Sequence, residues 1–191
     1  MTPELRTLYL ADAQARFRSL RTLAERAIAQ IDEQQWFAAL AQGGNRIAHL
    51  MKHLTGNMRS RWTDFLTSDG EKPARNRDDE FEIRLTDTAQ SLRRQWVEAW
   101  TCLFSALEGL TPADLDGTVL IRGEQHSVIE AINRQLAHYA MHVGQIVLIA
   151  KTLRGQQWQS LSIPKGGSSS FNQAMEKGKC TGWSKGMLEG G

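Results

Sequence analysis

The chain has little cysteine, and its two thiols, Cys102 and Cys180, lie far apart in the sequence. No CxxC pair is present, which argues against a disulfide scaffold, a thiolate zinc site and a dithiol redox centre. Such cysteine usage suits a reducing compartment, and we therefore expect the protein in the cytoplasm. With 191 residues the chain is long enough to bury a core as one domain without disulfides.

Long apolar runs are also missing, since no segment approaches the roughly 18 consecutive apolar residues that a membrane span needs. The first residues show no basic region followed by an apolar stretch, so no export signal is predicted. Neither sign of charge dominates, because 23 basic and 21 acidic side chains give a formal net charge of +2. A chain with mixed charges lacks the electrostatic footprint for nucleic acid or anionic lipid. We expect a soluble protein that binds neither nucleic acid nor a membrane.

Apolar residues recur at helical spacing in four stretches, which predicts an all-α fold, a four-helix bundle. The stretches cover about residues 3–31, 45–67, 86–108 and 128–153. Thr2 and Pro3 are a typical helix start, and Ser127 with Glu130 forms a capping box before the last helix. The β-branched stretch 118–126, with its turn at Gly123, predicts a small β-hairpin before that helix.

Residues 68–85 contain turn formers and a charged run but no helical stripe. This composition predicts a long crossover between the second and third helices, which permits them to be parallel neighbours. The charged residues Arg75, Arg77 and Asp78 are most simply part of a solvated loop. A lid over a pocket is the alternative.

Beyond Gly155 the chain is rich in glycine and serine, which predicts a mostly irregular C-terminal tail. Trp158, Leu161 and Ile163 could dock the first part of this tail on the bundle. We expect one bundle domain over residues 1–172 and a flexible segment over residues 173–191.

Histidine carries the functional signal. His138 and His142 are four residues apart on the last predicted helix, so both imidazoles lie on one face, where they can bind one metal ion. Counting about 100° per residue places this pair at the border of the apolar stripe. His53 lies at the border of the apolar stripe of the second helix, on the side with the same rotational sense. Such borders face each other when the second and fourth helices run antiparallel, which brings the three rings together. Three histidines leave a coordination position open for water or substrate, as in catalytic zinc sites.

Other interpretations of the histidines stay open. A histidine at the border of a helix stripe is more often a hydrogen-bonded boundary residue than a metal ligand. His49 and His53 form a second pair at four-residue spacing, although His49 is predicted on the solvent face. His126 is most simply a residue of the hairpin or of the helix entry. No glutamate follows His138, so the HExxH pattern of zinc proteases is absent.

Several polar residues near the histidines could orient ligands or substrate. Asn57 and Arg61 follow His53 at successive helical turns, and Gln135 and Gln145 flank the pair of the fourth helix. No serine, cysteine or carboxylate holds a position that marks it as a nucleophile or general base. The sequence therefore assigns no catalytic residue.

Three motifs together resemble the DinB/YfiT-like superfamily. They are KHLTGNM at 52–58, DFLTSDGEKP at 64–73 followed by RNRDDEFE at 75–82, and HYAMHVGQI at 138–146. More narrowly, the chain is similar to a bacterial subgroup of that superfamily without an assigned function. The likeness runs from the first helix to about residue 172.

The resemblance implies a four-helix bundle with a long crossover and a divalent metal, commonly zinc or nickel, bound by one histidine of the second helix and two of the fourth. These positions match His53, His138 and His142. Characterised relatives include enzymes that use the metal to activate a low-molecular-weight thiol for transfer or isomerisation, and others are regarded as hydrolases. The resemblance thus implies a metal-dependent hydrolase or thiol transferase with a small-molecule substrate, and it favours a homodimer. The alternative is a non-catalytic bundle that the metal stabilises, or a binding protein.

Overall fold

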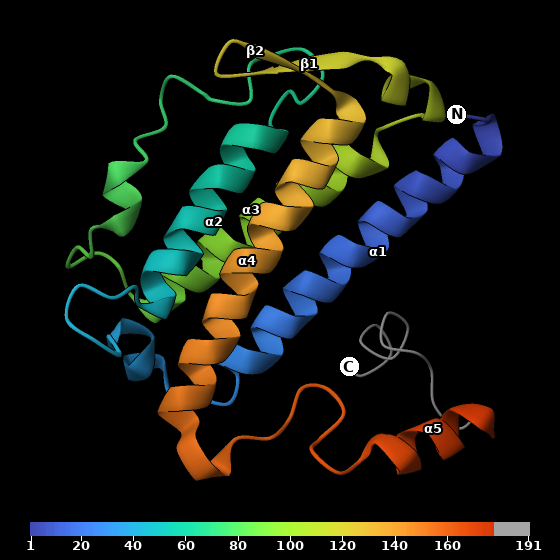
Figure 1. Ribbon diagram of the computed structural model, residues 1–191. Helices are drawn as coiled ribbons and strands as arrows, with labels where there is room; N and C mark the ends of the chain where they lie inside the picture. The colour runs from blue at the N-terminus through green and yellow to red at the C-terminus, as the bar shows by residue number, and fades with distance from the viewer. Residues whose placement is uncertain (178–191) are drawn as a thin grey trace.

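The computed structural model describes residues 1–177 of the chain (Figure 1). Within this range the protein is mostly helical, with five α-helices and one two-stranded antiparallel sheet. The helices are α1 (Pro3–Ile28), α2 (Ile47–Trp62), α3 (Ala89–Glu108), α4 (Val128–Arg154) and α5 (Ser168–Glu176). The strands are β1 (Thr118–Ile121) and β2 (Glu124–Ser127). The four predicted long helices and the predicted hairpin are therefore confirmed.

Side-chain caps mark the starts of α1, α3 and α4. The hydroxyl of Thr2 accepts a hydrogen bond from the backbone N–H of Leu5 at the start of α1. The predicted capping box at α4 is present, since Ser127 accepts from the N–H of Glu130 and the Glu130 carboxylate accepts from the N–H of Ser127. A second box, formed by Thr88 and Ser91, starts α3 at Ala89, three residues later than the prediction. These side chains satisfy backbone donors that have no partner within the helix.

The second helix is shorter than predicted. It begins at Ile47 and ends at Trp62, whereas the apolar pattern predicts a helix over residues 45–67. Asp64 follows the end with a φ of 49°, in the left-handed region that a continuing α-helix cannot use. The spacing of apolar residues does not indicate such a change of backbone direction, so it does not predict that the helix ends at Trp62.

The four long helices pack side by side around one apolar core (Figure 1). α1 and α4 run in one direction along the bundle, and α2 and α3 run in the other. The long crossover makes the parallel arrangement of α2 and α3 possible, as the sequence predicts. α2 and α4 are antiparallel and in contact, which is the arrangement that the histidine site requires.

A buried hydrogen-bond chain joins α2 to α4 through Tyr139, the neighbour of His138. The indole N–H of Trp62 donates to the hydroxyl of Tyr139 at 3.1 Å, and that hydroxyl donates to Oδ1 of Asn57 at 2.9 Å. All three side chains are buried, so each polar group needs its partner. The chain of contacts fixes how the two helices face each other.

The crossover packs on α2 through Arg75 and Glu80, whereas Arg77 and Asp78 are exposed, as predicted for a solvated loop. The side chain of Arg75 is only 5% exposed, and its guanidinium donates to Glu80 at 2.8 and 3.0 Å, so the two charges leave water as a pair. Asp69 accepts hydrogen bonds from the backbone N–H groups of Arg122 and Gly123 in the hairpin turn. The crossover is thus attached to both the bundle and the hairpin.

The segment after Gly155 differs in part from the predicted irregular tail. Trp158 and Leu161 are half-buried against the core, whereas Ile163 is exposed. α5 follows as a regular helix with no buried side chain and with neither glycine nor proline among its residues. The predicted flexible segment over 173–191 falls, for residues 178–191, outside the described part of the chain. Among the described helices, none combines the length and apolar character that crossing a bilayer requires.

Candidate metal centre

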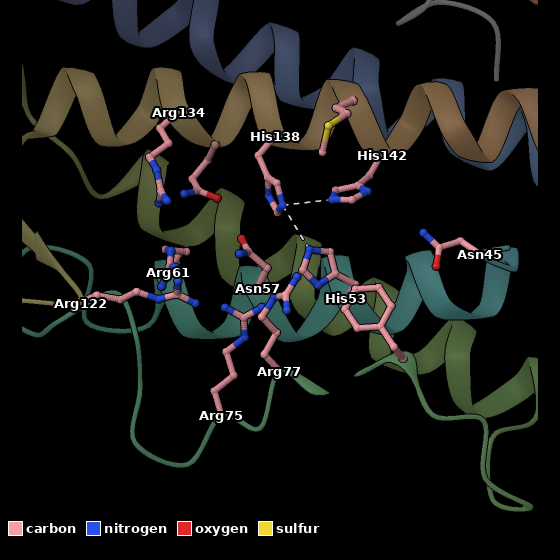
Figure 2. A pocket seen from close by; sticks show the side chains of 13 residues that line it. Asn45, His53, Asn57, Arg61, Arg75, Arg77, Arg122, Arg134, His138 and His142 are labelled. Carbon is pink, nitrogen blue, oxygen red and sulfur yellow. Dashed lines mark hydrogen bonds between the residues drawn. The ribbon is translucent and has the colours of Figure 1, made fainter. Parts of the chain in front are cut away.

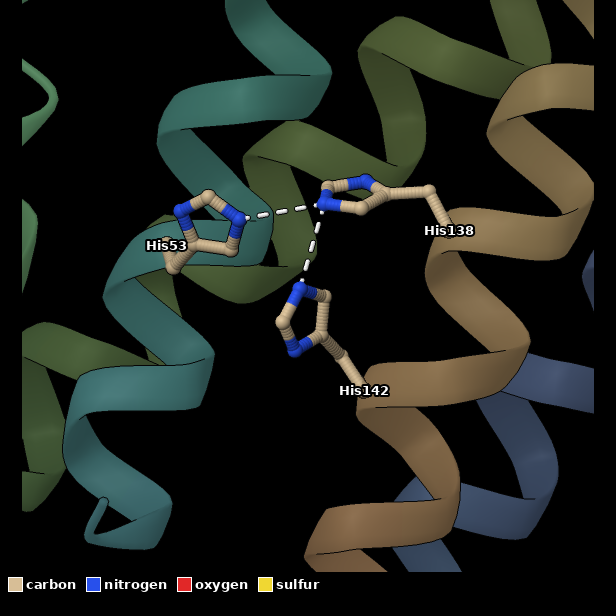
Figure 3. A group of neighbouring side chains, drawn as sticks. All are labelled: His53, His138 and His142. Atoms are coloured by element: carbon tan, nitrogen blue, oxygen red, sulfur yellow. Dashed lines mark hydrogen bonds between the residues drawn. The ribbon is translucent and has the colours of Figure 1, made fainter. Parts of the chain in front are cut away.

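Three histidines from α2 and α4 converge inside the bundle (Figure 3). Nε2 of His138 lies 3.2 Å from Nε2 of His53 and 3.1 Å from Nε2 of His142. The three candidate ligand atoms all lie within 4.8 Å of one another. The antiparallel packing of α2 and α4 therefore brings together the histidines that the sequence analysis selects.

The other two histidines lie outside this cluster. His49 is half-buried on α2 rather than on the solvent face, and its Nδ1 accepts a hydrogen bond from the backbone N–H of Arg46 at 3.3 Å. His126 belongs to β2, where its Nε2 lies 3.6 Å from the carboxylate of Glu124. No site with four imidazoles forms within residues 1–177.

Hydrogen bonds at Nδ1 set the tautomer of two rings. Nδ1 of His53 lies 2.8 Å from Oε2 of Glu80, and an ionised carboxylate only accepts, so Nδ1 carries the proton. Nδ1 of His142 lies 3.0 Å from the amide oxygen of Gln145, which likewise only accepts. In each neutral ring the Nε2 atom is therefore unprotonated and offers its lone pair to the cluster.

This arrangement fits a cation better than a set of hydrogen bonds among the rings. Nε2 of His138 carries one proton at most, so it can donate to only one of its two Nε2 neighbours. Zinc–nitrogen bonds of about 2.0–2.1 Å in a tetrahedral site place neighbouring nitrogens about 3.3 Å apart, close to both observed contacts. Imidazole also suits nickel. The two contacts of His138 thus match the nitrogen spacing of a zinc site, and the three imidazoles have the donor chemistry for a divalent metal.

Burial keeps the rings of His138 and His142 in the form that binds metal. Burial, together with the nearby His142 and His53, lowers the pKa of His138 to about 3. Burial also lowers the pKa of His142, against a hydrogen bond with Gln145 that raises it. A metal ion competes with protons for imidazole, so rings that are neutral at pH 7 are ready to bind one.

Glu80 is a site residue that sequence reasoning missed. Burial raises the pKa of this carboxyl, but hydrogen bonds from His53 and Arg75 outweigh it, so the pKa lies below its ordinary value. A carboxylate that accepts from the second nitrogen of a ligating histidine fixes the ring and increases its basicity. Glu80 stands in a run of acidic residues in the crossover, and no spacing rule tells which of them turns inward.

The four polar residues predicted near the histidines have different surroundings. Gln145 contacts the site through the ring of His142. Asn57, Arg61 and Gln135 are buried and line a neighbouring cavity. Arg61 donates to the carbonyl of Gly70 and to Glu71, whereas Oε1 of Gln135 has no partner in the described part of the chain.

The cavity has a volume of about 480 Å³ and lies against the three histidines (Figure 2). A volume of this order accommodates a small molecule. Besides the histidines and the three polar residues named above, its lining includes Phe81, Met141 and further arginines. An open cavity at a three-histidine cluster is typical of catalytic rather than structural zinc sites, which are closed by four protein ligands.

The fold and the site together define a helical protein whose histidine cluster can hold a metal ion next to a small-molecule cavity. Comparison with known protein families assigns the chain to one of them. The profile of a family described as protein of unknown function, DUF1572, matches residues 4–167, so the chain belongs to that family. The family is part of the DinB/YfiT-like superfamily, in agreement with the resemblance of the motifs. No curated protein and no solved structure matches the chain.

Proposed function

We propose that this protein binds a divalent metal ion, zinc or nickel, through His53, His138 and His142, and that it acts on a small molecule as a thiol transferase or hydrolase. The convergence of the three Nε2 atoms carries the proposal, because Glu80 and Gln145 leave two of them unprotonated. We also infer a bundle of the DinB/YfiT-like type, since the family belongs to that superfamily.

A divalent ion held by three neutral imidazoles supplies Lewis-acid chemistry, which for zinc lowers the pKa of a bound water to about 7. The residues of the chain hold this arrangement in place: Glu80 and Gln145 fix two rings at their Nδ1 atoms. The amide groups of Asn57 and Gln135 lie at the cavity, where they can orient a ligand.

The lining of the cavity favours thiol transfer over hydrolysis. No Asp or Glu side chain lines it among the described residues, so these offer no carboxylate as general base for a water molecule. A thiol needs such a base less, because its ordinary pKa of about 8.5 is already close to neutrality.

Metal analysis of the protein, purified without a histidine tag, tests the site. We expect about one equivalent of zinc or nickel in the wild type, and a loss of at least about tenfold in His142→Ala. His126→Ala is the matched control, because it removes a histidine outside the cluster. A metal-free wild type, or equal metal content in both variants, contradicts the proposal.

Activity assays then separate an enzyme from a non-catalytic bundle. Metal-loaded protein is mixed with low-molecular-weight thiols and an electrophile, and in parallel with ester and amide substrates. We expect turnover with a thiol that a chelator abolishes and that His142→Ala lacks. Bound metal without turnover in either screen favours the metal-stabilised bundle.

A further inference from the structure

Positive charge gathers in the cavity beside the histidines. Five guanidinium groups line it, and among the described residues no carboxylate does. They come from α2, the crossover, the hairpin turn and α4, as Figure 2 shows. The five are Arg61, Arg75, Arg77, Arg122 and Arg134.

Neighbouring carboxylates compensate only part of this charge. Glu71 lies 2.9 Å from Arg61, 3.3 Å from Arg75 and 3.2 Å from Arg122, so one negative group serves three arginines. Glu80 pairs with Arg75 and also holds the His53 ring. Three guanidinium groups thus share two carboxylates, and one of these, Glu80, also accepts a hydrogen bond from His53.

Arg134 and Arg77 add charge with little or no compensation. Arg134 forms no ion pair with any residue of the described part. Among the described residues, Asp78 is the one carboxylate that pairs with Arg77; it is exposed and lies 3.9 Å away, while the Arg77 guanidinium lies over the ring of Phe81. Burial, and then the charges of Arg75 and Arg134, lower the pKa of Arg61 against the opposing effect of Glu71. Like charges that line one cavity repel one another, and a bound anion relieves that repulsion.

Arg61 also offers a donor that no described residue uses. The side chain of Arg61 is only 4% exposed, yet its buried Nε has no hydrogen-bond partner among the described residues. Guanidinium groups present two parallel N–H donors, a geometry that matches carboxylate and phosphate oxygens. An oxyanion beside Arg61 would supply the missing acceptor.

We propose that the ligand of this cavity is an anionic small molecule with a carboxylate or phosphate group, held by Arg134, Arg61 and Arg122. These three lie at one end of the cavity, Asn45 lies at the other, and the histidines lie between them (Figure 2). A ligand bound by its anion at the arginine end therefore extends toward the histidines. The anion site stands on the arginines, whereas its link to a reaction rests on the proposed function.

Inorganic phosphate and succinate are the probes, each titrated by calorimetry into zinc-loaded, full-length protein in a chloride buffer. We expect saturable binding of at least one of the two. Arg134→Gln should weaken that binding about tenfold, because a charge-assisted hydrogen bond is lost. The two probes distinguish a phosphate-bearing ligand from one that carries carboxylates.

Arg154→Gln is the matched control, since Arg154 is exposed on the same helix and lies outside the cavity. Its effect on the dissociation constant should stay within about twofold. Absence of saturable binding of both anions, or equal binding by the two variants, overturns the anion site.

Zinc content, measured in the same samples, keeps the two proposals apart. Zinc retained without arginine-dependent anion binding overturns the anion site alone. Arginine-dependent binding in protein that takes up no zinc supports the anion site and contradicts the metal centre.

Discussion

Gly56 lies one helical turn beyond His53, where the side chain of Glu80 passes close to α2. A β-carbon at this position would overlap the carboxylate of Glu80. The missing side chain therefore lets Glu80 approach Nδ1 of His53 to 2.8 Å. Glycine inside a helix costs about 1 kcal/mol relative to alanine, so its presence here needs a reason, and access for Glu80 supplies one.

Replacement of Gly56 by alanine should weaken the metal site without unfolding the helix. We expect Gly56→Ala to lower zinc affinity about 10- to 100-fold, the usual effect of losing a partner of a ligating histidine. Competition with a chromophoric chelator measures this change. Gly144→Ala is the matched control, because a β-carbon there meets no atom within 4 Å although Gly144 is only two residues from His142. Equal affinities in the two variants would show that the contact with Glu80 has no effect on binding.

At the scale of elements, Glu71 joins three parts of the structure. Its carboxylate pairs with Arg61 of α2, with Arg75 of the crossover and with Arg122 of the hairpin turn. Burial raises the pKa of Glu71, but the hydrogen bond from Arg61 and the three arginine charges outweigh it and hold the pKa below its ordinary value. The ionised form is therefore the one that holds these elements together.

Stability should consequently fall in acid. As the pH drops, the unfolded chain takes up the proton on Glu71 first, because its unfolded pKa is the higher one. The contribution of Glu71 is complete above the ordinary value of 4.5 and disappears as the pH falls through the lower folded value. Urea unfolding between about pH 7 and pH 3 measures this loss. Glu71→Gln should be less stable at neutral pH and lose less stability in acid; parallel pH curves for variant and wild type contradict the assignment.

Elements with a local signal could be predicted from the sequence, and those held by distant contacts could not. The capping box of Ser127 and Glu130 marks the start of α4, and four-residue spacing places His138 and His142 on one face. The burial of Arg75 and Glu80 depends on the crossover folding back onto α2. Their charges pair only in three dimensions, so in the sequence they have the pattern of a solvated loop.

At the scale of the whole molecule, the size of the apolar core decides whether folding depends on the metal centre. The cluster joins two positions that are 85 residues apart, His53 and His138. The bundle nevertheless has an extensive core of its own, in which the largest fully buried side chains include Phe17, Trp62, Trp100 and Tyr139. Metal supplies the folding energy of domains that are too small for such a core. This chain is large enough to fold on the energy of its own core.

Removal of the metal should therefore lower the melting temperature and leave the protein folded. Zinc at about 100 times its dissociation constant stabilises the folded state by about 2.7 kcal/mol. For a chain of this size that corresponds to a rise of roughly 5–11 °C. Circular dichroism melts with and without zinc measure the shift, and His142→Ala should show little of it. Loss of the helical signal on chelation would show that the metal has a structural role. This outcome favours the non-catalytic bundle over the enzyme, because a metal that is needed for folding does not require a reaction to account for it.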